Sequence, residues 1–340
     1  MVQSPNRSIT RFLFLVFGAA ALAVLCWRFG IADVLAAFGR VRPSYLLLYL
    51  ALSMAVVAGH ATRWRLVALA LGSVPAFARL VGARLAGDAV GWLVPSGRMA
   101  GEPVRVALVY ADGLEGSRAS AGVALDRLIE LMGNIVCAAT YVSVFASTRV
   151  FGGSRSGPLT LVGVLVVLLA ALSIPLAMLR TGRRPFAPLY ERPISIPRLR
   201  QLIGALRDTE EHLLVFFRDH AQTFMVGLLL ALCIEGLVIV QYEVLLASFG
   251  IELDLPTLLL ALVASGMSRT IPAPAGLGAL EASQVTVLAM ASGRAAEGFV
   301  VGILMRFHET LWMAAGLTVC LARGISIAGR RWSQSEEKAA

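Results

Sequence analysis

The sequence predicts an all-α polytopic membrane protein, with about six full spans and two re-entrant broken helical hairpins in an inverted repeat. Three observations predict this fold class. The 340-residue chain is 58% hydrophobic and only 15% charged, whereas a soluble domain carries about 25% charged residues. Apolar runs of roughly 20 residues, enough to cross the hydrocarbon core of a bilayer, recur along the whole chain. Two further apolar segments are interrupted near their middles by proline and glycine.

The apolar runs are typical of spanning helices, because strands of a membrane barrel would alternate apolar and polar residues. The expected full spans are residues 9–27, 45–67, 119–144, 159–179, 224–248 and 296–321. The first run follows Arg7 and Arg11 as in a signal peptide. No small-x-small cleavage site precedes Trp27, so we expect this run to be a retained span.

Arginine-rich segments predict the orientation of these spans. The stretch 180–220 contains eight arginines, and basic residues recur in the C-terminal tail. The positive-inside rule places both segments in the cytoplasm. Arg28, Arg40 and Arg42 oppose this orientation unless they lie beside a short interfacial helix at 31–38. We expect a multi-pass protein of the inner-membrane type with both termini in the cytoplasm.

The predicted organisation contains two membrane halves and no sizeable soluble domain. The expected parts are a first membrane half at 1–180 with a hairpin at 76–112, a cytoplasmic basic linker at 181–220, a second membrane half at 221–325 with a hairpin at 256–292, and a cytoplasmic tail at 326–340. Apolar and charged residues alternate at helical spacing over 199–217. We expect this amphipathic helix to lie on the cytoplasmic surface of the membrane.

Each interrupted segment is predicted to form two short helices joined by irregular backbone. The breaks read VPSGRMAGEP at 94–103 and IPAPAGLGALE at 271–281. Proline removes a backbone donor and glycine destabilises a helix. Irregular backbone survives at membrane depth only where protein or a water-filled cavity surrounds it. The residues expected to break the helices are Pro95, Gly97, Gly101, Pro272, Pro274, Gly276 and Gly278.

Three charged residues recur in both halves at the same spacing of 25 and then 3 residues. The two sets are Glu102, Arg127 and Glu130, and Glu281, Arg306 and Glu309. Counting spans from a cytoplasmic N-terminus makes the two arginine-bearing helices run in opposite directions. The pattern predicts an inverted-topology repeat with a substrate site near the bilayer midplane, between the halves.

Two interpretations of these charges are open. A charged side chain at the centre of a spanning helix costs about 2.5 to 3.5 kcal/mol, and an ion pair within one helix would only neutralise itself. Alternatively, each arginine faces its own hairpin, pairs with Glu102 or Glu281, and borders a polar cavity. We favour the cavity because the whole set is duplicated. Arginine suits the phosphate of an anionic headgroup, since its planar fork donates two parallel hydrogen bonds and keeps its charge.

Other polar residues near the breaks are candidate cavity residues. They are Asp126, His308, Arg98 and Arg269. His308 either relays protons or is a hydrogen-bonded structural histidine. Arg98 and Arg269 either line cavity mouths or anchor the helices at the interface. The same two interpretations apply to Arg79, Arg84 and Asp88, whereas His60, Arg63 and Arg65 are predicted to be snorkelling anchors.

Other classes of function find little support in the sequence. The arginines behind the net charge of +9 lie beside apolar runs, as membrane anchors do, so we expect no nucleic-acid partner. The four cysteines lie in apolar spans without metal-ligand spacing. There is no GxSxG, HExxH or Walker motif. We therefore expect no metal, no cofactor and no catalytic residue.

The broken segments and charged motifs together resemble a known family. VPSGRMAGEPVR, DRLIE, SRTIPAPAGLGALE and RFHE resemble the lysylphosphatidylglycerol synthase transmembrane region, over about residues 10–325. This flippase-like family also forms the membrane half of the multiple peptide resistance factor. The resemblance implies a bacterial inner-membrane protein with two repeats and a central cavity where lipid headgroups cross. No aminoacyltransferase domain follows the last expected span, so we do not expect this chain to make lysyl-lipid.

The leading expectation is a lipid flippase, not an enzyme, that moves an anionic phospholipid or an isoprenoid lipid between leaflets. Some stand-alone relatives are associated with hopanoid synthesis, which makes a hopanoid one candidate cargo. One alternative is a membrane-embedded transferase that modifies a lipid with a glutamate as base. The other is a non-catalytic subunit of a lipid-synthesis assembly. The expected partners are membrane lipids, lipid-synthesis enzymes and a second copy of the chain in a homodimer.

Overall fold

The computed structural model of the chain describes residues 36, 39–72, 76–94, 99–148, 156–190, 197–270 and 278–324. Within these residues every regular element is a helix, so the all-α prediction is confirmed for this part of the chain. The expected span at 9–27 and the tail at 326–340 lie outside the described residues.

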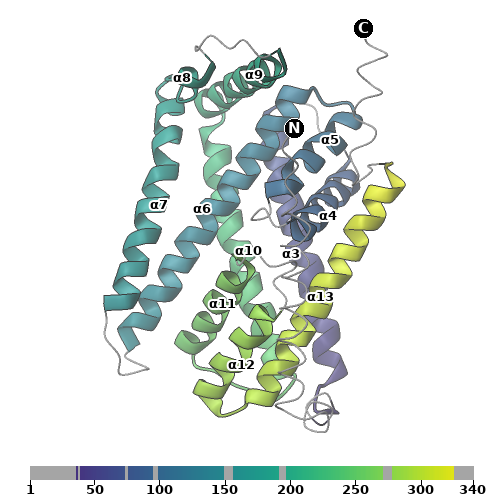
Figure 1. The fold of residues 1–340 in the computed structure, drawn as a ribbon, viewed down its shortest axis with the longest axis vertical. Coiled ribbons are helices and arrows are strands. Elements are labelled where there is room, and N and C mark those ends of the chain that lie inside the picture. Colours follow the sequence, from purple (N-terminus) through teal and green to yellow (C-terminus); the bar gives the residue numbers. More distant parts are fainter. Residues whose placement is uncertain are drawn as a thin grey trace, which may run out of the picture.

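The first half begins with a long helix, continues with the first hairpin, and ends with two long helices (Figure 1). These elements are α3 (Pro43–Ala70), α4 (Phe77–Leu93), the 3₁₀ turn η1 (Met99–Gly101), α5 (Glu102–Ala111), α6 (Gly116–Thr148) and α7 (Ser156–Arg180). Prolines at the first turns of α3 and α5 favour these starting points, because a proline there sacrifices no intrahelical hydrogen bond. α4 and α5 pack against each other across the break at 94–101.

The linker and the second half follow the same plan. Their elements are α8 (Ala187–Tyr190), α9 (Pro197–Asp219), α10 (Ala221–Ala247), α11 (Leu255–Thr270), α12 (Ala279–Ser292) and α13 (Ala295–Ala322). α11 and α12 pack against each other and form the second hairpin. Gly278 precedes α12 with a φ of +80°, a left-handed conformation that favours glycine over any residue with a side chain.

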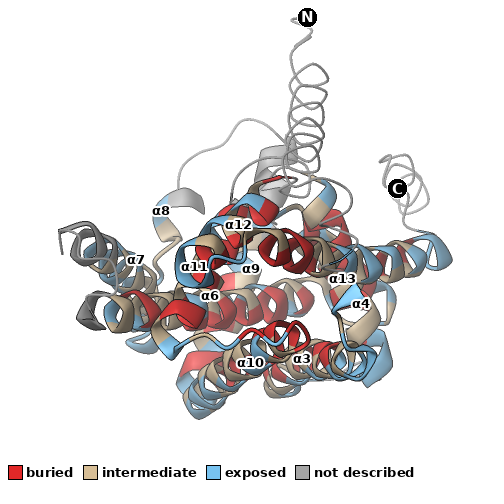
Figure 2. Cartoon of the chain, turned by 90° about the horizontal axis from the view of Figure 1, so that it is seen from below, coloured by how far each residue is buried: buried red, intermediate tan, exposed pale blue. Residues whose placement is uncertain are grey.

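Four helices of the described part are long and apolar enough to cross a membrane. They are Pro43–Ala70, Gly116–Phe145, Val162–Arg180 and Ala221–Ala247. α13 has the length of a span but carries Arg306, His308 and Glu309 near its middle. Large apolar side chains point outward from these helices, for example Leu47 at 70% exposure and Val167 at 67%. Figure 2 shows the exposed residues on the outer faces of the bundle, as expected for a multi-pass membrane protein whose surroundings are lipid.

The two hairpins lie at opposite ends of the bundle, and each packs against a long helix of the other half. α4 and α5 are in the upper half of the bundle in Figure 1, toward the end that also holds α9, whereas α11 and α12 are at the lower end. α4 packs against α13, and α11 packs against α6. The neighbouring helices α3 and α10 run in opposite directions, as do α6 and α13.

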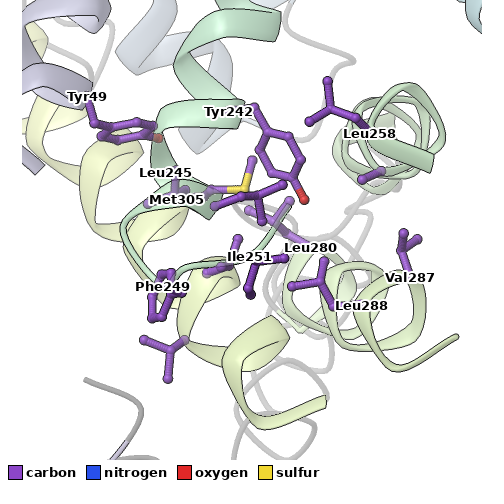
Figure 3. Close-up of a cluster of buried hydrophobic side chains, with 14 residues drawn as sticks. Tyr49, Tyr242, Leu245, Phe249, Ile251, Leu258, Leu280, Val287, Leu288 and Met305 are labelled. Atoms are coloured by element: carbon purple, nitrogen blue, oxygen red, sulfur yellow. The ribbon is translucent and has the colours of Figure 1, made fainter. Parts of the chain in front are cut away.

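Three clusters of buried apolar side chains hold these helices together. One cluster joins α10, α12 and α13 around Tyr242, Leu280 and Met305 (Figure 3). A second joins α6, α7, α9 and α10, where Phe216 of α9 is fully buried. The amphipathic helix of the linker therefore contributes its apolar face to the core of the protein. The third cluster joins α3, α4, α5 and α6 and surrounds the first hairpin.

Candidate functional site

The first hairpin meets α6 through a buried network of charges centred on Asp126. Three arginines, one each from α3, α4 and α5, donate to this carboxylate. The distances are 2.9 Å from Arg63 Nε, 3.3 Å from Arg84 Nη1 and 2.5 Å from Arg105 Nη2. The side chain of Asp126 is fully buried, and those of the three arginines are at most 4% exposed. One carboxylate thus binds three separate helices to α6.

Glu130, one helical turn after Asp126, extends the network. It accepts hydrogen bonds from Arg63 at 3.0 Å, from Arg84 at 2.8 and 3.1 Å, and from Arg127 at 3.1 Å. Among the described residues, the network contains four arginines and four carboxylates. Its members are Arg63, Arg84, Asp88, Glu102, Arg105, Asp126, Arg127 and Glu130.

A close contact between two glycines lets the first hairpin close over this network. A Cβ atom on Gly101 would lie 2.0 Å from the carbonyl oxygen of Gly87, and one on Gly87 would lie 2.4 Å from Cγ of Arg105. Side chains at either position would push α4 away from α5. The Arg105 guanidinium lies 4.2 Å from the ring centroid of Trp64, a cation–π contact that supports its buried position.

Arg127 lies at the edge of the network and donates fewer hydrogen bonds than the other arginines. Its Nε is 3.6 Å from Glu102, which starts α5, and its Nη1 donates to Glu130 at 3.1 Å. Its side chain is 14% exposed, and its buried Nε has no hydrogen-bond partner. Arg127 therefore keeps donor capacity for a further acceptor.

Arg306 occupies the corresponding place in the second half. Its Nε donates to Glu281, in the first turn of α12, at 3.1 Å, and its Nη1 donates to Glu309 at 3.1 Å. Its side chain is also 14% exposed, whereas Glu281 is 1% exposed. The missing side chain of Gly302 permits this contact, because a Cβ there would lie 2.8 Å from Cα of Glu281.

The rest of the second hairpin is joined to its neighbours by neutral hydrogen bonds. Gln284 of α12 accepts a short hydrogen bond from the Tyr242 hydroxyl of α10 and donates to Ser265 of α11 at 2.7 Å. All three side chains are buried. A hydrogen-bonded amide here connects three helices, as Asp126 connects its helices in the first half.

His308 connects α13 to α3, on the boundary between the halves. Its Nε2 forms a short hydrogen bond with the Ser53 hydroxyl, and Trp312 donates to both groups, at 2.6 Å to Ser53 and 3.0 Å to His308. This geometry fits the structural interpretation of His308, and its role in proton transfer stays a prediction.

The structure brings each predicted set of charges together. Arg127 and Arg306 each contact a glutamate on their own helix and the glutamate in the first turn of the hairpin. The polar cavity beside them stays a prediction. The remaining candidates, namely Pro95, Gly97, Arg98, Pro272, Pro274, Gly276 and the side chain of Arg269, lie outside the described residues.

The prediction that Arg63 is a snorkelling anchor is wrong. Its side chain is 1% exposed and belongs to the Asp126 network, whereas its neighbour Arg65 is exposed. Arg84 is likewise buried, while Arg79 is exposed and pairs with Asp112 at 3.1 Å. One feature of the sequence could have predicted this network. Asp126 stands next to Arg127 in an apolar helix, and a buried carboxylate there needs a cation of its own.

A comparison with protein families identifies the family to which the chain belongs. Among the described residues, no group of three His, Cys, Asp or Glu side chains is arranged to hold a metal ion. No curated protein matches the sequence. A family model described as the lysylphosphatidylglycerol synthase TM region matches residues 11–317, which include both hairpins and both sets of charges. The chain belongs to this family of membrane proteins with a lipid-related function.

Proposed function

We propose that this protein moves a lipid with an anionic headgroup between the two leaflets of the bacterial inner membrane, with Arg127 and Arg306 as the headgroup-binding residues. Desolvation of the headgroup is the main barrier to crossing. A charged site at membrane depth lowers that barrier while the acyl or isoprenoid tails stay in hydrocarbon. The lipid undergoes no covalent change in this scheme.

The proposal uses a repeat that extends over four helices in each half. Glu281 follows Glu102 by 179 residues. The same shift moves α3, α4, α5 and α6 to 222–249, 256–272, 281–290 and 295–327. The observed helices α10, α11, α12 and α13 are Ala221–Ala247, Leu255–Thr270, Ala279–Ser292 and Ala295–Ala322. Every helix of the first set thus has a counterpart within a few residues at each end.

The main support for the proposal is the set of charges that both halves share. The positions 179 residues after Arg63, Arg84, Asp88, Arg105 and Asp126 hold Tyr242, Val263, Met267, Gln284 and Met305, none of them charged. Of the eight charged residues in the network, only Glu102, Arg127 and Glu130 recur as charges, in Glu281, Arg306 and Glu309. A half can therefore fold without the five additional charges. The three shared charges need another explanation, and binding of a charged ligand supplies one.

Arg127 and Arg306 have the properties that an anion site requires. Both are 14% exposed, so neither is sealed in the core. The Nε of Arg127 has no hydrogen-bond partner, and its guanidinium group suits a phosphate. In a medium of low dielectric constant, such a contact is stronger than at a water-exposed surface.

The positions of the hairpins suggest how the site would be exposed to each leaflet in turn. We interpret the two halves as an inverted repeat, because equivalent helices run in opposite directions and the hairpins lie at opposite ends of the bundle (Figure 1). The arginine-rich linker helix α9 lies at the end that holds α4 and α5, which we assign to the cytoplasm. Rocking of one half against the other would then open one end while it closes the other.

The test is lipid translocation in proteoliposomes that contain a headgroup-labelled anionic phospholipid. We expect wild-type protein to speed the exchange of label between leaflets, and Arg127→Ala with Arg306→Ala to abolish the increase. Arg65→Ala is the matched control, because Arg65 is an exposed arginine outside both sets of charges, and it should translocate at the wild-type rate.

Two outcomes would contradict the proposal. Equal rates for wild type and for the double variant would show that lipids do not cross at these arginines. A wild-type protein inactive with anionic, zwitterionic and isoprenoid lipids would instead favour a lipid-modifying transferase or a subunit of a lipid-synthesis assembly.

A further inference from the structure

The helix α13 is tied to the first half of the protein at both of its ends. At its C-terminal end, Arg323 donates to Asp112, which follows α5, at 2.8 and 3.5 Å. At its N-terminal end, Glu297 accepts a hydrogen bond from Arg40, which precedes α3, at 2.8 Å. The two ends of α13 lie at opposite ends of the bundle (Figure 1). We call these contacts the upper and the lower ion pair, after their places in that view.

The upper ion pair is built around a nearly buried carboxylate. The side chain of Asp112 is 3% exposed, and it also accepts from Arg79 of α4 at 3.1 Å. Asp112 therefore receives an arginine from each half of the protein. A carboxylate with so little access to water depends on its partners, because their loss leaves its charge uncompensated.

α13 lies directly against α4 beside the upper ion pair. A Cβ atom on Gly316 would lie 2.1 Å from the carbonyl oxygen of Leu85. The Cys320 thiol, about one turn before Arg323, is fully buried and donates to the carbonyl oxygen of Ala86 at 3.9 Å. At these residues the two helices leave no space for a further side chain. The interface between the halves is thus closed at its upper end, and Cys320 is sealed inside it.

The lower ion pair is formed as well but is more exposed. Arg40 is 63% exposed and Glu297 is 11% exposed. Nearby, the amide of Arg42 donates to the carbonyl oxygen of Ser248 at 3.3 Å, which joins the start of α3 to the end of α10. Because water competes for exposed ions, we expect the lower ion pair to resist separation less than the upper one.

We propose that the two ion pairs are latches that hold opposite ends of the protein closed, and that they open one at a time. This inference rests on the proposed function for the rocking of one half against the other. α13 carries one partner of each pair on a single stiff helix, so a tilt that moves one end away from the first half presses the other end onto it. With both pairs formed, the protein is in the closed intermediate between two open states. Breaking one pair therefore raises the population that is open at that end.

The first experiment uses Cys320 as a reporter of the upper end. In a protein with Cys26→Ala, Cys137→Ala and Cys233→Ala, Cys320 is the remaining thiol, and its labelling by a water-soluble maleimide is followed in nanodiscs. Labelling requires α13 to move away from α4. We expect Asp112→Asn to raise the labelling rate about tenfold, the change that follows when the closed state loses about 1.4 kcal/mol. Because this substitution lies outside α13, local fraying of the reporter's own helix does not explain a rise.

Two variants control for effects other than loss of the ion pair. Glu115→Gln removes a nearby carboxylate that is 60% exposed and pairs with Arg118 within the first half, and it should leave the labelling rate unchanged. Asp112→Arg combined with Arg323→Asp restores an ion pair across the halves and should return the rate toward that of the wild type. Equal rates in wild type and Asp112→Asn, or no rescue by the exchanged pair, would overturn the inference.

The second experiment tests the lower ion pair with a buried serine as the reporter position. Ser248 is 1% exposed and contacts the start of α3 through its carbonyl oxygen. Ser248→Cys supplies the single thiol when Cys320→Ala is added to the same background. We expect Glu297→Gln to raise its labelling about threefold, a smaller change because the pair is exposed. Glu252→Gln, at an exposed glutamate shortly after Ser248, should have no effect. Labelling that does not respond to Glu297→Gln would overturn the role of the lower ion pair.

The two reporters together separate a latch from a loss of structure. Asp112→Asn should raise labelling of Cys320 while labelling of the Ser248→Cys variant stays at or below its rate without Asp112→Asn, because opening one end presses the other closed. A parallel rise at both positions would mean general unfolding and would overturn the inference. Neither measurement requires transport. Latches that respond as expected in a protein that moves no lipid would contradict the proposed function alone, whereas lipid translocation without any response of the reporters would overturn the latches alone.

Discussion

The first and second hairpins are attached to their long helices by different chemistry. The first uses eight charged side chains that include three fully buried arginines around Asp126. Among the described side chains, the second uses the charges of Glu281, Arg306 and Glu309 and adds a neutral network through Gln284. Because the two hairpins have equivalent helices, the comparison separates charges that the architecture needs from charges that one half alone has acquired.

This difference in attachment indicates which hairpin is more strongly restrained. A buried ion network contributes little net stability, since desolvation offsets the attraction, but removal of one partner leaves an uncompensated charge. Moving the first hairpin away from α6 would break several such pairs at once. Among the described side chains, the second hairpin is joined to α13 by the ion pair between Glu281 and Arg306, and to α10 by a neutral hydrogen bond. We therefore expect the second hairpin to be the more mobile element during lipid movement.

The largest expected effect concerns Asp126. Replacing it with asparagine leaves three buried arginines with one carboxylate fewer, and we expect a loss of about 3–5 kcal/mol in the free energy of unfolding. Met305 occupies the corresponding position in the second half and is packed among apolar side chains. Met305→Leu conserves volume and should cost less than about 1.5 kcal/mol. Unfolding of the purified protein in mixed micelles at increasing denaturing detergent measures both changes.

Similar losses in the free energy of unfolding for Asp126→Asn and Met305→Leu would contradict this difference between the two halves. That result would mean that Asp126 is replaceable, and that the arginines of the first half are neutralised by other groups when it is removed.

The sequence predicted the breaks between α4 and α5 and between α11 and α12, and the shared spacing of charges, but not the Asp126 network. Proline and glycine within apolar segments mark a break locally, and two sets with equal spacing are visible without a structure. Arg63 was misassigned because its partners, Asp126 and Glu130, lie 63 and 67 residues later. Only tertiary packing brings them together, and an arginine near the end of a span otherwise resembles an interfacial anchor.

A smaller effect is expected from a pair of glycines at equivalent positions, Gly87 in α4 and Gly266 in α11. A Cβ on Gly87 would lie 2.4 Å from Arg105, whereas a Cβ on Gly266 meets nothing within 4 Å. Gly87→Ala should therefore destabilise the protein by about 1–3 kcal/mol through overpacking. Gly266→Ala should stabilise it by up to about 1 kcal/mol, because alanine favours the helix.

The same detergent titration compares the two glycine variants. Opposite signs would confirm that the first hairpin is the more tightly closed of the two. A destabilising Gly266→Ala would indicate that α11 packs as closely as α4, and the proposed difference in mobility would lose its support. Sequence alone does not separate these glycines, since both lie within apolar helices and differ only in what the fold places beside them.

The smallest effect is expected at Tyr242, which stands where the first half has Arg63. Tyr242→Phe removes the hydroxyl that donates to Gln284, but Gln284 keeps its hydrogen bond to Ser265. We expect a loss of about 1 kcal/mol, because a neutral hydrogen bond contributes roughly that much net stability. Tyr110→Phe is the control, since Tyr110 is 62% exposed on α5 and its hydroxyl should add little.

A double variant makes this last prediction sharper. When Gln284→Leu accompanies Tyr242→Phe, the hydrogen bond between the two side chains is lost only once, so the pair should cost less than the sum of the single changes. The loss of the Ser265 contact belongs to Gln284→Leu alone. In the first half, removal of Arg63 together with Asp126 still leaves Arg84 and Arg105 without one of their acceptors. If Tyr242→Phe lowered the free energy of unfolding as much as Asp126→Asn does, the neutral network would restrain the second hairpin as strongly as the ion pairs restrain the first.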